Sequence, residues 1–475
     1  MEKIWLSSYP EGVPENITPP PFSSLKDLIE SSLVKYSERI AYSNMGSTLT
    51  FKQLDEMSLN FACYLQQDLK LKKGDRVAIM LPNILQYPVA LCGILRAGLV
   101  VVNVNPLYTP RELKHQLSDS GAQSIIILDN FAHVLAEIID ETAIEQVILT
   151  KVGDLLSFPK NHIINFVLKY IKKVIPEYKL NSVVSFQDTL DKKDHQTLDP
   201  VDVSENDIAF LQYTGGTTGL SKGAMITHRN MVFNLHQSKA WQGNLFDDVE
   251  VIIAITALPL YHIFSLQSNC LAMMLDGGEN VLITNPRDFP AFVKELKKHK
   301  FVYITGVNTL YASLLNTPGF DEIDFSQLRF TVGGGMAIQK AVSKDWEKIT
   351  GQPILQAYGL TETSPAAVVN PINITEFSGS IGLPISSTEV SIRDDQGDNI
   401  AVGELGEICI RGPQVMLGYW EQPDETAKVM LPDNWFKTGD IGRMDEQGYI
   451  YIEDRKKDMI LVSGFNVYPN EIEGV

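Results

Sequence analysis

Apolar and polar positions in the first part of the chain alternate between short strand-like runs and longer helix-like runs. Apolar runs predict strands at 76–81, 99–104 and 124–128, and amphipathic or apolar segments predict helices at 85–97 and 111–120. Strands that alternate with helices indicate parallel sheets covered on both faces. A second block, from about residue 207 to 367, repeats this style.

From about Gly379 the pattern changes to short strands, at 388–393, 405–411 and 449–453, separated by Gly, Pro and Asp. This spacing favours a small β-barrel or distorted sheet. A new unit begins at 459–462, but only a few residues remain before Val475, too few to fold as a domain. The predicted fold is therefore α/β, with a large N-terminal domain over 1–454 and the start of a truncated small C-terminal domain at 459–475. The large domain divides into two doubly wound αβ subdomains, over about 1–378, and a small distorted β-barrel, over about 379–454.

The amino-acid composition argues against several classes of function and site. A formal net charge of −18 argues against a nucleic-acid partner, because nucleic-acid phosphates would be repelled. The four cysteines are far apart, so they predict neither a metal site nor a disulfide framework and favour a reducing cytoplasm. The longest stretch without formal charge, 251–275, contains Pro259 and His262 and is predicted to be a buried strand and helix.

The segment from Tyr213 to Gly223 carries the strongest chemical signal. After an apolar strand it combines glycines, hydroxyl side chains and one lysine. Glycine lets backbone N–H groups turn toward an anion, threonine adds donors and lysine adds charge, so the segment is predicted to bind phosphates. The spacings of a Walker A loop and of a Rossmann fingerprint are both absent. A Gly/Thr loop without a ligand remains the alternative.

The order Tyr-Thr-Gly-Gly-Thr-Thr-Gly-x-x-Lys-Gly resembles the signature loop of the adenylate-forming superfamily, which includes acyl- and aryl-CoA synthetases and luciferases. Gly215 stands where serine is usual, a variant similar to bacterial long-chain fatty-acid–CoA ligases. The resemblance implies ATP and AMP binding, a fatty acid and coenzyme A as further substrates, and Mg²⁺. It assigns the phosphates to Thr214, Gly215, Gly216, Thr217, Thr218, Gly219 and Lys222.

Three further motifs match that superfamily. Tyr358-Gly359-Leu360-Thr361-Glu362, read alone, is a strand end with a helix cap. The resemblance places Tyr358 and Gly359 on the adenine, Thr361 on the α-phosphate and Glu362 on Mg²⁺, with Thr361, Glu362 and Lys222 as catalytic residues. It places the glycine turn at Gly334 and Gly335 against the adenine, and Asp440 and Arg455 on the ribose.

The substrate side is predicted from the same resemblance. His262, Phe264, Gly333 and Gly334 would line the acyl site, although a lone histidine in an apolar segment is usually a core residue. No aspartate occurs between 251 and 275, which favours an uncharged, fatty substrate over an amino acid. The predicted function is long-chain fatty-acid–CoA ligation, with a fatty-acyl-AMP or aryl-CoA ligase and a non-catalytic acyl-adenylate-binding module as alternatives.

Residues 455–458 correspond to the hinge between the two domains of the superfamily. Lys457 falls at the hinge position, and Gly464 and Phe465 match the loop that lines the CoA tunnel. The superfamily also has a catalytic lysine near the end of the small domain, beyond Val475. The chain is therefore expected to bind nucleotide and fatty acid but to catalyse the complete reaction poorly.

Residues 160–180 form a separate candidate for a surface contact. Asn165, Lys169, Lys172 and Lys173 share one helical face, and Ile163, Ile164, Val167, Tyr170, Ile171 and Val174 cover the other. A basic amphipathic helix in an acidic protein could bind anionic lipid at the cytoplasmic face of the inner membrane. The alternative is a helix packed on the core with its lysines in water. A homodimer is left open.

Overall fold

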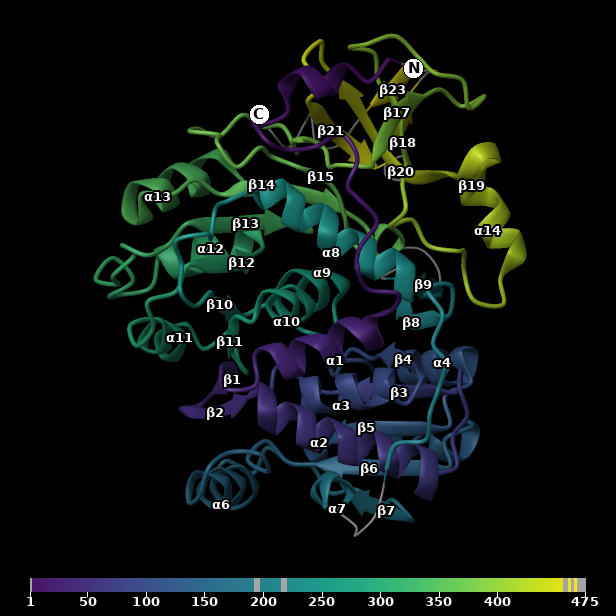
Figure 1. Ribbon diagram of the computed structural model, residues 1–475, viewed down its shortest axis with the longest axis vertical. Coiled ribbons are helices and arrows are strands. Elements are labelled where there is room, and N and C mark those ends of the chain that lie inside the picture. The colour runs from purple at the N-terminus through teal and green to yellow at the C-terminus, as the bar shows by residue number, and fades with distance from the viewer. Residues whose placement is uncertain (1, 192–196, 215–219, 456–459, 463–464, 468–475) are drawn as a thin grey trace.

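The computed structural model describes residues 2–191, 197–214, 220–455, 460–462 and 465–467. Two large mixed sheets and a smaller antiparallel sheet follow one another from the bottom to the top of Figure 1. Helices lie between and around the sheets, so the α/β class predicted from the strand–helix alternation is confirmed.

The lower sheet has seven strands. Its order is β7 (Val183–Ser185), β6 (Gln146–Thr150), β5 (Ser124–Leu128), β3 (Arg76–Met80), β4 (Val100–Asn103), β8 (Ile208–Tyr213) and β9 (Gly223–Thr227). All neighbours are parallel except β8 and β9, which form an antiparallel pair. The phosphate loop predicted from the sequence therefore joins the two strands of this pair.

The upper large sheet has nine strands. Its order is β16 (Leu383–Pro384), β15 (Ala366–Val369), β14 (Leu355–Gly359), β13 (Phe330–Gly334), β12 (Tyr303–Gly306), β10 (Ile253–Thr256), β11 (Glu279–Leu282), β1 (Ile40–Asn44) and β2 (Ser47–Thr50). The strands from β14 to β1 are all parallel to their neighbours.

The two large sheets exchange strands, which corrects the predicted division into consecutive blocks. The N-terminal pair β1–β2 belongs to the upper sheet, and β8–β9, expected to open the second block, completes the lower sheet. Strand pairing places these segments in their sheets, because β1 pairs in parallel with β11 of the upper sheet and β8 pairs in parallel with β4 of the lower sheet.

Local sequence determines where the helices begin. At α4, for example, Thr109 and Glu112 form a capping box, Pro110 occupies the first turn and Gly121 ends the helix at φ 59°. The helices are α1 (Leu25–Lys35), α2 (Phe51–Cys63), α3 (Gln86–Arg96), α4 (Pro110–Ser120), α5 (Ala132–Ala136), α6 (Lys160–Phe166), α7 (Phe186–Leu190), α8 (His228–Gln242), α9 (Ile263–Ser265), α10 (Ala272–Asp276), α11 (Phe289–Leu296), α12 (Asn308–Leu315), α13 (Lys340–Thr350) and α14 (Pro423–Val429).

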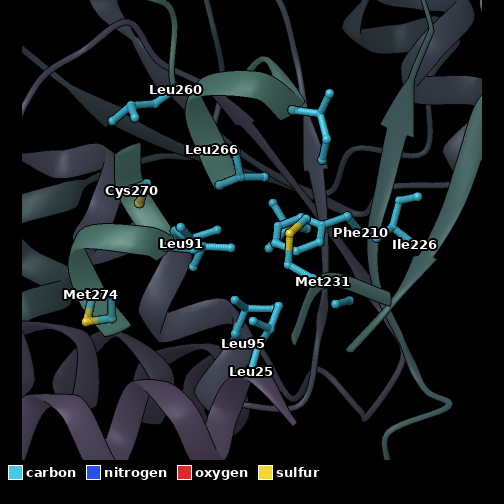
Figure 2. Packing of buried hydrophobic residues seen from close by; sticks show 14 of the residues in the cluster. Leu25, Leu91, Leu95, Phe210, Ile226, Met231, Leu260, Leu266, Cys270 and Met274 are labelled. Atoms are coloured by element: carbon cyan, nitrogen blue, oxygen red, sulfur yellow. The ribbon is translucent and has the colours of Figure 1, made fainter. Parts of the chain in front are cut away.

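The largest hydrophobic cluster joins the two large sheets. Figure 2 shows Leu25 of α1, Leu91 and Leu95 of α3 and Met231 of α8 close to Phe210 of β8. Leu266 and Cys270, in the turns between α9 and α10, belong to the same cluster. The uncharged segment 251–275 is thus a buried strand and helix, as predicted, and no described helix has the length and apolar character needed to cross a bilayer.

The third sheet contains β17 (Glu389–Arg393), β18 (Gly406–Arg411), β20 (Trp435–Met444) and β19 (Met430–Leu431), with β21 (Ile450–Arg455) on β20. All of its pairs are antiparallel. Within the described residues the strand order is open, so the structure has a sheet rather than a closed barrel. The last described strands, β22 (Ile460–Val462) and β23 (Phe465–Val467), pair only with each other.

The amphipathic segment forms a shorter helix than the one predicted over 160–180. Helix α6 ends at Phe166 and continues as one π-helical turn over Val167–Ile171. Ile164 and Leu168 pack against the core, whereas Ile163, Tyr170 and Ile171 are exposed. Asn165, expected on the solvent side with the lysines, bonds instead to Gly153 and Asp154.

Candidate active site

The glycine turn and the Tyr358 motif meet at one edge of the upper sheet. β13 and β14 are parallel neighbours with Gly334 opposite Ala357, so their carboxyl ends lie side by side. Gly335 turns the chain away at φ 75°, a conformation that favours glycine. At Gly359, a Cβ atom would lie 1.8 Å from the carbonyl oxygen of Pro365, so only glycine fits there.

Glu362 follows β14 in a short 3₁₀ turn and is 7% exposed. Its Oε1 accepts a hydrogen bond of 2.7 Å from the hydroxyl of Tyr419. Burial raises the pKa of Glu362, and the Tyr419 hydroxyl and the nearby Lys222 ammonium oppose that rise. Glu362 is therefore an acidic side chain in a largely desolvated position, where pairing of its ionised form with a bound cation would be strongly stabilised.

The base of the predicted phosphate loop lies beside Glu362. The backbone N–H of Thr214 donates to the carbonyl of Lys222 at 3.0 Å, and the Lys222 ammonium sits 4.9 Å from the centre of the Tyr419 ring. Lys222 also forms an ion pair with Glu425 of α14. The predicted phosphate-binding residues Gly215, Gly216, Thr217, Thr218 and Gly219 lie outside the described residues.

Tyr358, Asp440 and Arg455 form one polar cluster. The Tyr358 hydroxyl donates to Asp440 Oδ2 at 2.6 Å, and Arg455 Nε lies 3.4 Å from Asp440 Oδ1. Burial, and secondly the Asp440 carboxylate, raises the pKa of Tyr358 well above its ordinary value, so the phenol stays neutral and donates. Pairing of Asp440 with Arg455 across β20 and β21 fixes this geometry.

These groups open into one cavity of about 880 Å³. Its polar end is lined by Thr214, Gly334, Gly335, Tyr358, Gly359, Thr361, Glu362, Asp440 and Arg455. Its apolar end is defined by Phe264, Ala272, Tyr303, Phe330 and Val332, which belong to one hydrophobic cluster, and Trp241 together with the polar side chains of Ser238, Gln242, Gln267 and Ser268 also lines the cavity. A cavity with one polar and one apolar end suits a ligand that joins a nucleotide to a hydrocarbon chain.

His262 borders the cavity next to Phe264. Its Nδ1 accepts from the backbone N–H of Phe264 at 3.3 Å. Although the imidazole faces the cavity, the protein packed around it lowers its pKa. A neutral ring at the cavity wall is consistent with a lining role and not with a charged anchor.

Among the predicted site residues whose surroundings the structure describes, Lys222 and Gly333 do not line the cavity. A Cβ atom on Gly333 would meet Ile338 and Ile354, so this residue faces the hydrophobic core, which corrects the expectation that it lines the acyl site. Lys457 and Gly464 lie outside the described residues, and Phe465 is described only by its backbone pairing with Val462.

Sequence reasoning missed several residues of the site. Tyr419 reaches Glu362 because its segment pairs with β9 through Ala224. The sequence Leu417-Gly418-Tyr419-Trp420 gave only a weak local signal. Trp241, Tyr303 and Phe330 lie on α8, β12 and β13 and have the composition of ordinary core residues. Only the sheet topology reveals that they surround a cavity.

Among the described residues, no group of three or more His, Cys, Asp or Glu side chains could hold a metal ion by itself. Mg²⁺ is commonly held by one or two carboxylates together with the phosphates of a substrate. The buried Glu362 carboxylate at the polar end fits that donor pattern.

Known proteins resemble this chain in sequence and in fold. The family described as AMP-binding enzyme matches residues 29–420. The chain is 55% identical to a long-chain-fatty-acid–CoA ligase of Escherichia coli O157:H7, over 100% of this chain and 84% of the relative. A long-chain-fatty-acid–CoA ligase of Bacillus subtilis is 38% identical over 99% and 83% of the two chains. Among solved structures, ATP-bound MatB from Rhodopseudomonas palustris superposes with a TM-score of 0.79 at 25% identity, covering 94% of this chain and 82% of that chain.

Proposed function

Because this chain belongs to the family of AMP-binding enzymes, we propose that it is a long-chain-fatty-acid–CoA ligase, like the bacterial relatives that it matches over its full length. The enzyme activates a fatty acid with ATP and then transfers the acyl group to coenzyme A. The observation that carries the proposal is one cavity lined both by the polar residues of the recognised motifs and by a hydrophobic cluster.

In the first step, an oxygen of the fatty-acid carboxylate attacks the α-phosphorus of ATP, and the bond to the β-phosphate oxygen breaks. The products are acyl-AMP and pyrophosphate. The substrate supplies the nucleophile, so the protein has to align the two reactants and stabilise charge on the phosphate oxygens. We assign the α-phosphate to the Thr361 hydroxyl, and the β- and γ-phosphates to the segment from Thr214 to Lys222.

The adenosine is assigned to the edge formed by β13 and β14. The Gly334–Gly335 turn leaves space for a planar base beside Tyr358, and the Asp440 carboxylate can accept hydrogen bonds from the ribose hydroxyls. Arg455, which forms an ion pair with Asp440, would lie next to the ribose. Mg²⁺ is assigned to Glu362, and when bound it neutralises charge on the phosphate oxygens.

The acyl chain is assigned to the apolar end of the cavity. His262 and Phe264 border the position of the carboxyl group, and Tyr303 and Phe330 stack at 5.4 Å between ring centres deeper in the wall. No charged side chain lines this apolar end among the described residues. Burial of each additional methylene would contribute about 0.8 kcal/mol.

In the second step the CoA thiol attacks the acyl carbon, a thioester forms and AMP leaves. We assign Lys457 to the hinge that permits this step and Gly464 and Phe465 to the CoA side. ATP and CoA as substrates indicate a cytoplasmic site of action. The homodimer stays a prediction.

Isothermal titration with non-hydrolysable acyl-adenylates tests the proposal directly. In these mimics a sulfamate replaces the phosphate, and the acyl group is palmitoyl, acetyl or benzoyl. We expect the palmitoyl mimic to bind at least about a hundredfold more tightly than the acetyl mimic, because it fills the apolar end. Tightest binding of the benzoyl mimic would identify an aryl-CoA ligase instead, and equal affinity for all three would contradict the acyl assignment.

Product analysis separates the remaining alternatives. Incubation with ATP, palmitate and CoA should yield palmitoyl-CoA and AMP, at the low rate expected for this chain. Release of palmitoyl-AMP without thioester formation would favour a fatty-acyl-AMP ligase. Tight mimic binding with neither product would favour a non-catalytic binding module.

A further inference from the structure

Residues 158–174 expose an unusual concentration of apolar side chains. Six of the seventeen large apolar side chains that are exposed in the described chain fall within this run. They are Phe158, Ile163, Phe166, Tyr170, Ile171 and Val174, which are between 46% and 81% exposed. Isolated exposed apolar residues are ordinary on protein surfaces, but a contiguous group indicates an interaction site.

Polar contacts on the inner side hold this group in its outward orientation. Asn165 accepts from the N–H of Gly153 at 2.8 Å and donates to Asp154 at 3.0 Å. The Lys160 ammonium donates to the carbonyl of Gly46 at 2.8 Å, and Asn130 donates to the carbonyl of Val174 at 3.1 Å. Because both ends and the middle of the segment are tied down, its apolar side chains cannot turn inward without breaking these bonds.

The charge of the segment has the opposite sign to that of the whole protein. Residues 158–179 contain five lysines and one glutamate, in a chain whose formal net charge is −18. Lys169, Lys172 and Lys173 are exposed beside the apolar residues, and the Lys169 ammonium lies 5.5 Å from the centre of the Tyr170 ring. Apolar and aromatic side chains bordered by lysines are typical of elements that lie in the headgroup region of a membrane.

We propose that residues 158–179 form a docking surface for an anionic lipid bilayer, separate from the catalytic cavity. Charge complementarity selects the bilayer over a second copy of the chain. In a two-fold symmetric dimer the same patch would face itself, and its lysines would repel one another. Helix α6 lies at the end of the molecule opposite the antiparallel sheet, so a bilayer at this surface would leave the upper part of the protein uncovered (Figure 1).

Flotation with lipid vesicles tests the surface on the whole chain. Vesicles of phosphatidylglycerol mixed with phosphatidylcholine are compared with vesicles of phosphatidylcholine alone. We expect the protein to float with the anionic vesicles and to be released by salt. The double variant Phe166→Ser/Ile171→Ser should lower the partition coefficient at least about tenfold through lost apolar burial. The triple variant Lys169→Glu/Lys172→Glu/Lys173→Glu should lower it roughly a hundredfold or more through lost attraction.

Matched controls separate the surface from general effects. Lys340→Glu/Lys344→Glu/Lys348→Glu on the exposed side of α13 makes the same change in net charge, and Leu107→Ser removes an exposed apolar side chain elsewhere. Both should float like the parent protein, and all variants should bind the palmitoyl-adenylate mimic normally. Equal flotation of the parent protein and the 166/171 and 169/172/173 variants would overturn the proposal. Conversion of a dimer to a monomer by Phe166→Ser/Ile171→Ser, with flotation unchanged, would identify a second copy as the occupant.

Discussion

Replacing Tyr419 with phenylalanine removes one atom from the candidate metal site. The Tyr419 hydroxyl donates to the buried Oε1 of Glu362 at 2.7 Å, while the ring packs under Lys222. Phenylalanine keeps the ring and its contact with the ammonium. A hydrogen bond to a charged group contributes about 1.5–3 kcal/mol, so its loss should weaken Mg²⁺-dependent ATP binding by a factor of about 10–150.

The pH dependence of ATP binding reports the same interaction through a second measurement. Burial already raises the pKa of Glu362, and the Tyr419 hydroxyl opposes that rise. In Tyr419→Phe the pKa should rise further, so the carboxylate is neutralised at a higher pH as the solution is acidified. Mg²⁺-dependent ATP binding, measured by titration calorimetry across neutral and mildly acidic pH, should therefore begin to fall at a higher pH than in the parent protein.

A matched variant shows whether the effect is local. Tyr451→Phe also removes a hydroxyl that donates to a carboxylate, here Asp445 at 3.2 Å and away from the cavity. It should leave both the ATP affinity and its pH dependence unchanged. If Tyr419→Phe behaved like Tyr451→Phe, Tyr419 would not position Glu362 and the reasoning would fail.

Three further changes probe other parts of the candidate site. Glu362→Ala should lower the rate of pyrophosphate release roughly 10²–10³-fold through loss of one electrostatic contact, and a near-normal rate would remove Glu362 from the catalytic residues. Glu425→Gln should free Lys222 from its ion pair and tighten ATP binding by up to about fivefold, as exposed pairs are weak; weaker binding would mean that Glu425 holds Lys222 in place. Ala272→Phe should fill the apolar end and reduce affinity for the palmitoyl mimic roughly tenfold without changing AMP affinity, whereas an equal loss for both ligands would place Ala272 outside the acyl site.

Local elements of the fold could be predicted well because their signals are local. The apolar runs at 76–81 and 124–128 are β3 and β5, and the helix expected at 111–120 is α4 with its capping box. The exchange of β1–β2 and β8–β9 between the large sheets depends on pairing between distant strands, as between Tyr42 and Asn280. Such pairing leaves no periodicity within either segment. The sequence pattern therefore does not show that the two large sheets exchange strands.

The site residues also divide into those that carry a local sequence motif and those that only tertiary contacts place at the site. Thr361, Glu362 and the glycine turn carry recognisable motifs, and the fold brings them to one cavity. Tyr419, Trp241 and Tyr303 contribute through contacts made only in the folded chain. At residues 160–171 the segment is helical, but it is α-helical only to Phe166 and π-helical to Ile171, and the bonds of Asn165 to Gly153 and Asp154 depend on contacts that the local pattern does not show.

A crystal structure with the non-hydrolysable palmitoyl-adenylate bound is the most direct measurement of the central assignment. We expect the adenine beside Gly334 and Tyr358, the ribose hydroxyls within hydrogen-bond distance of Asp440, and the hydrocarbon chain running toward Tyr303 and Phe330. An adenylate bound outside this cavity, or one with its hydrocarbon chain directed away from Tyr303 and Phe330, would contradict it.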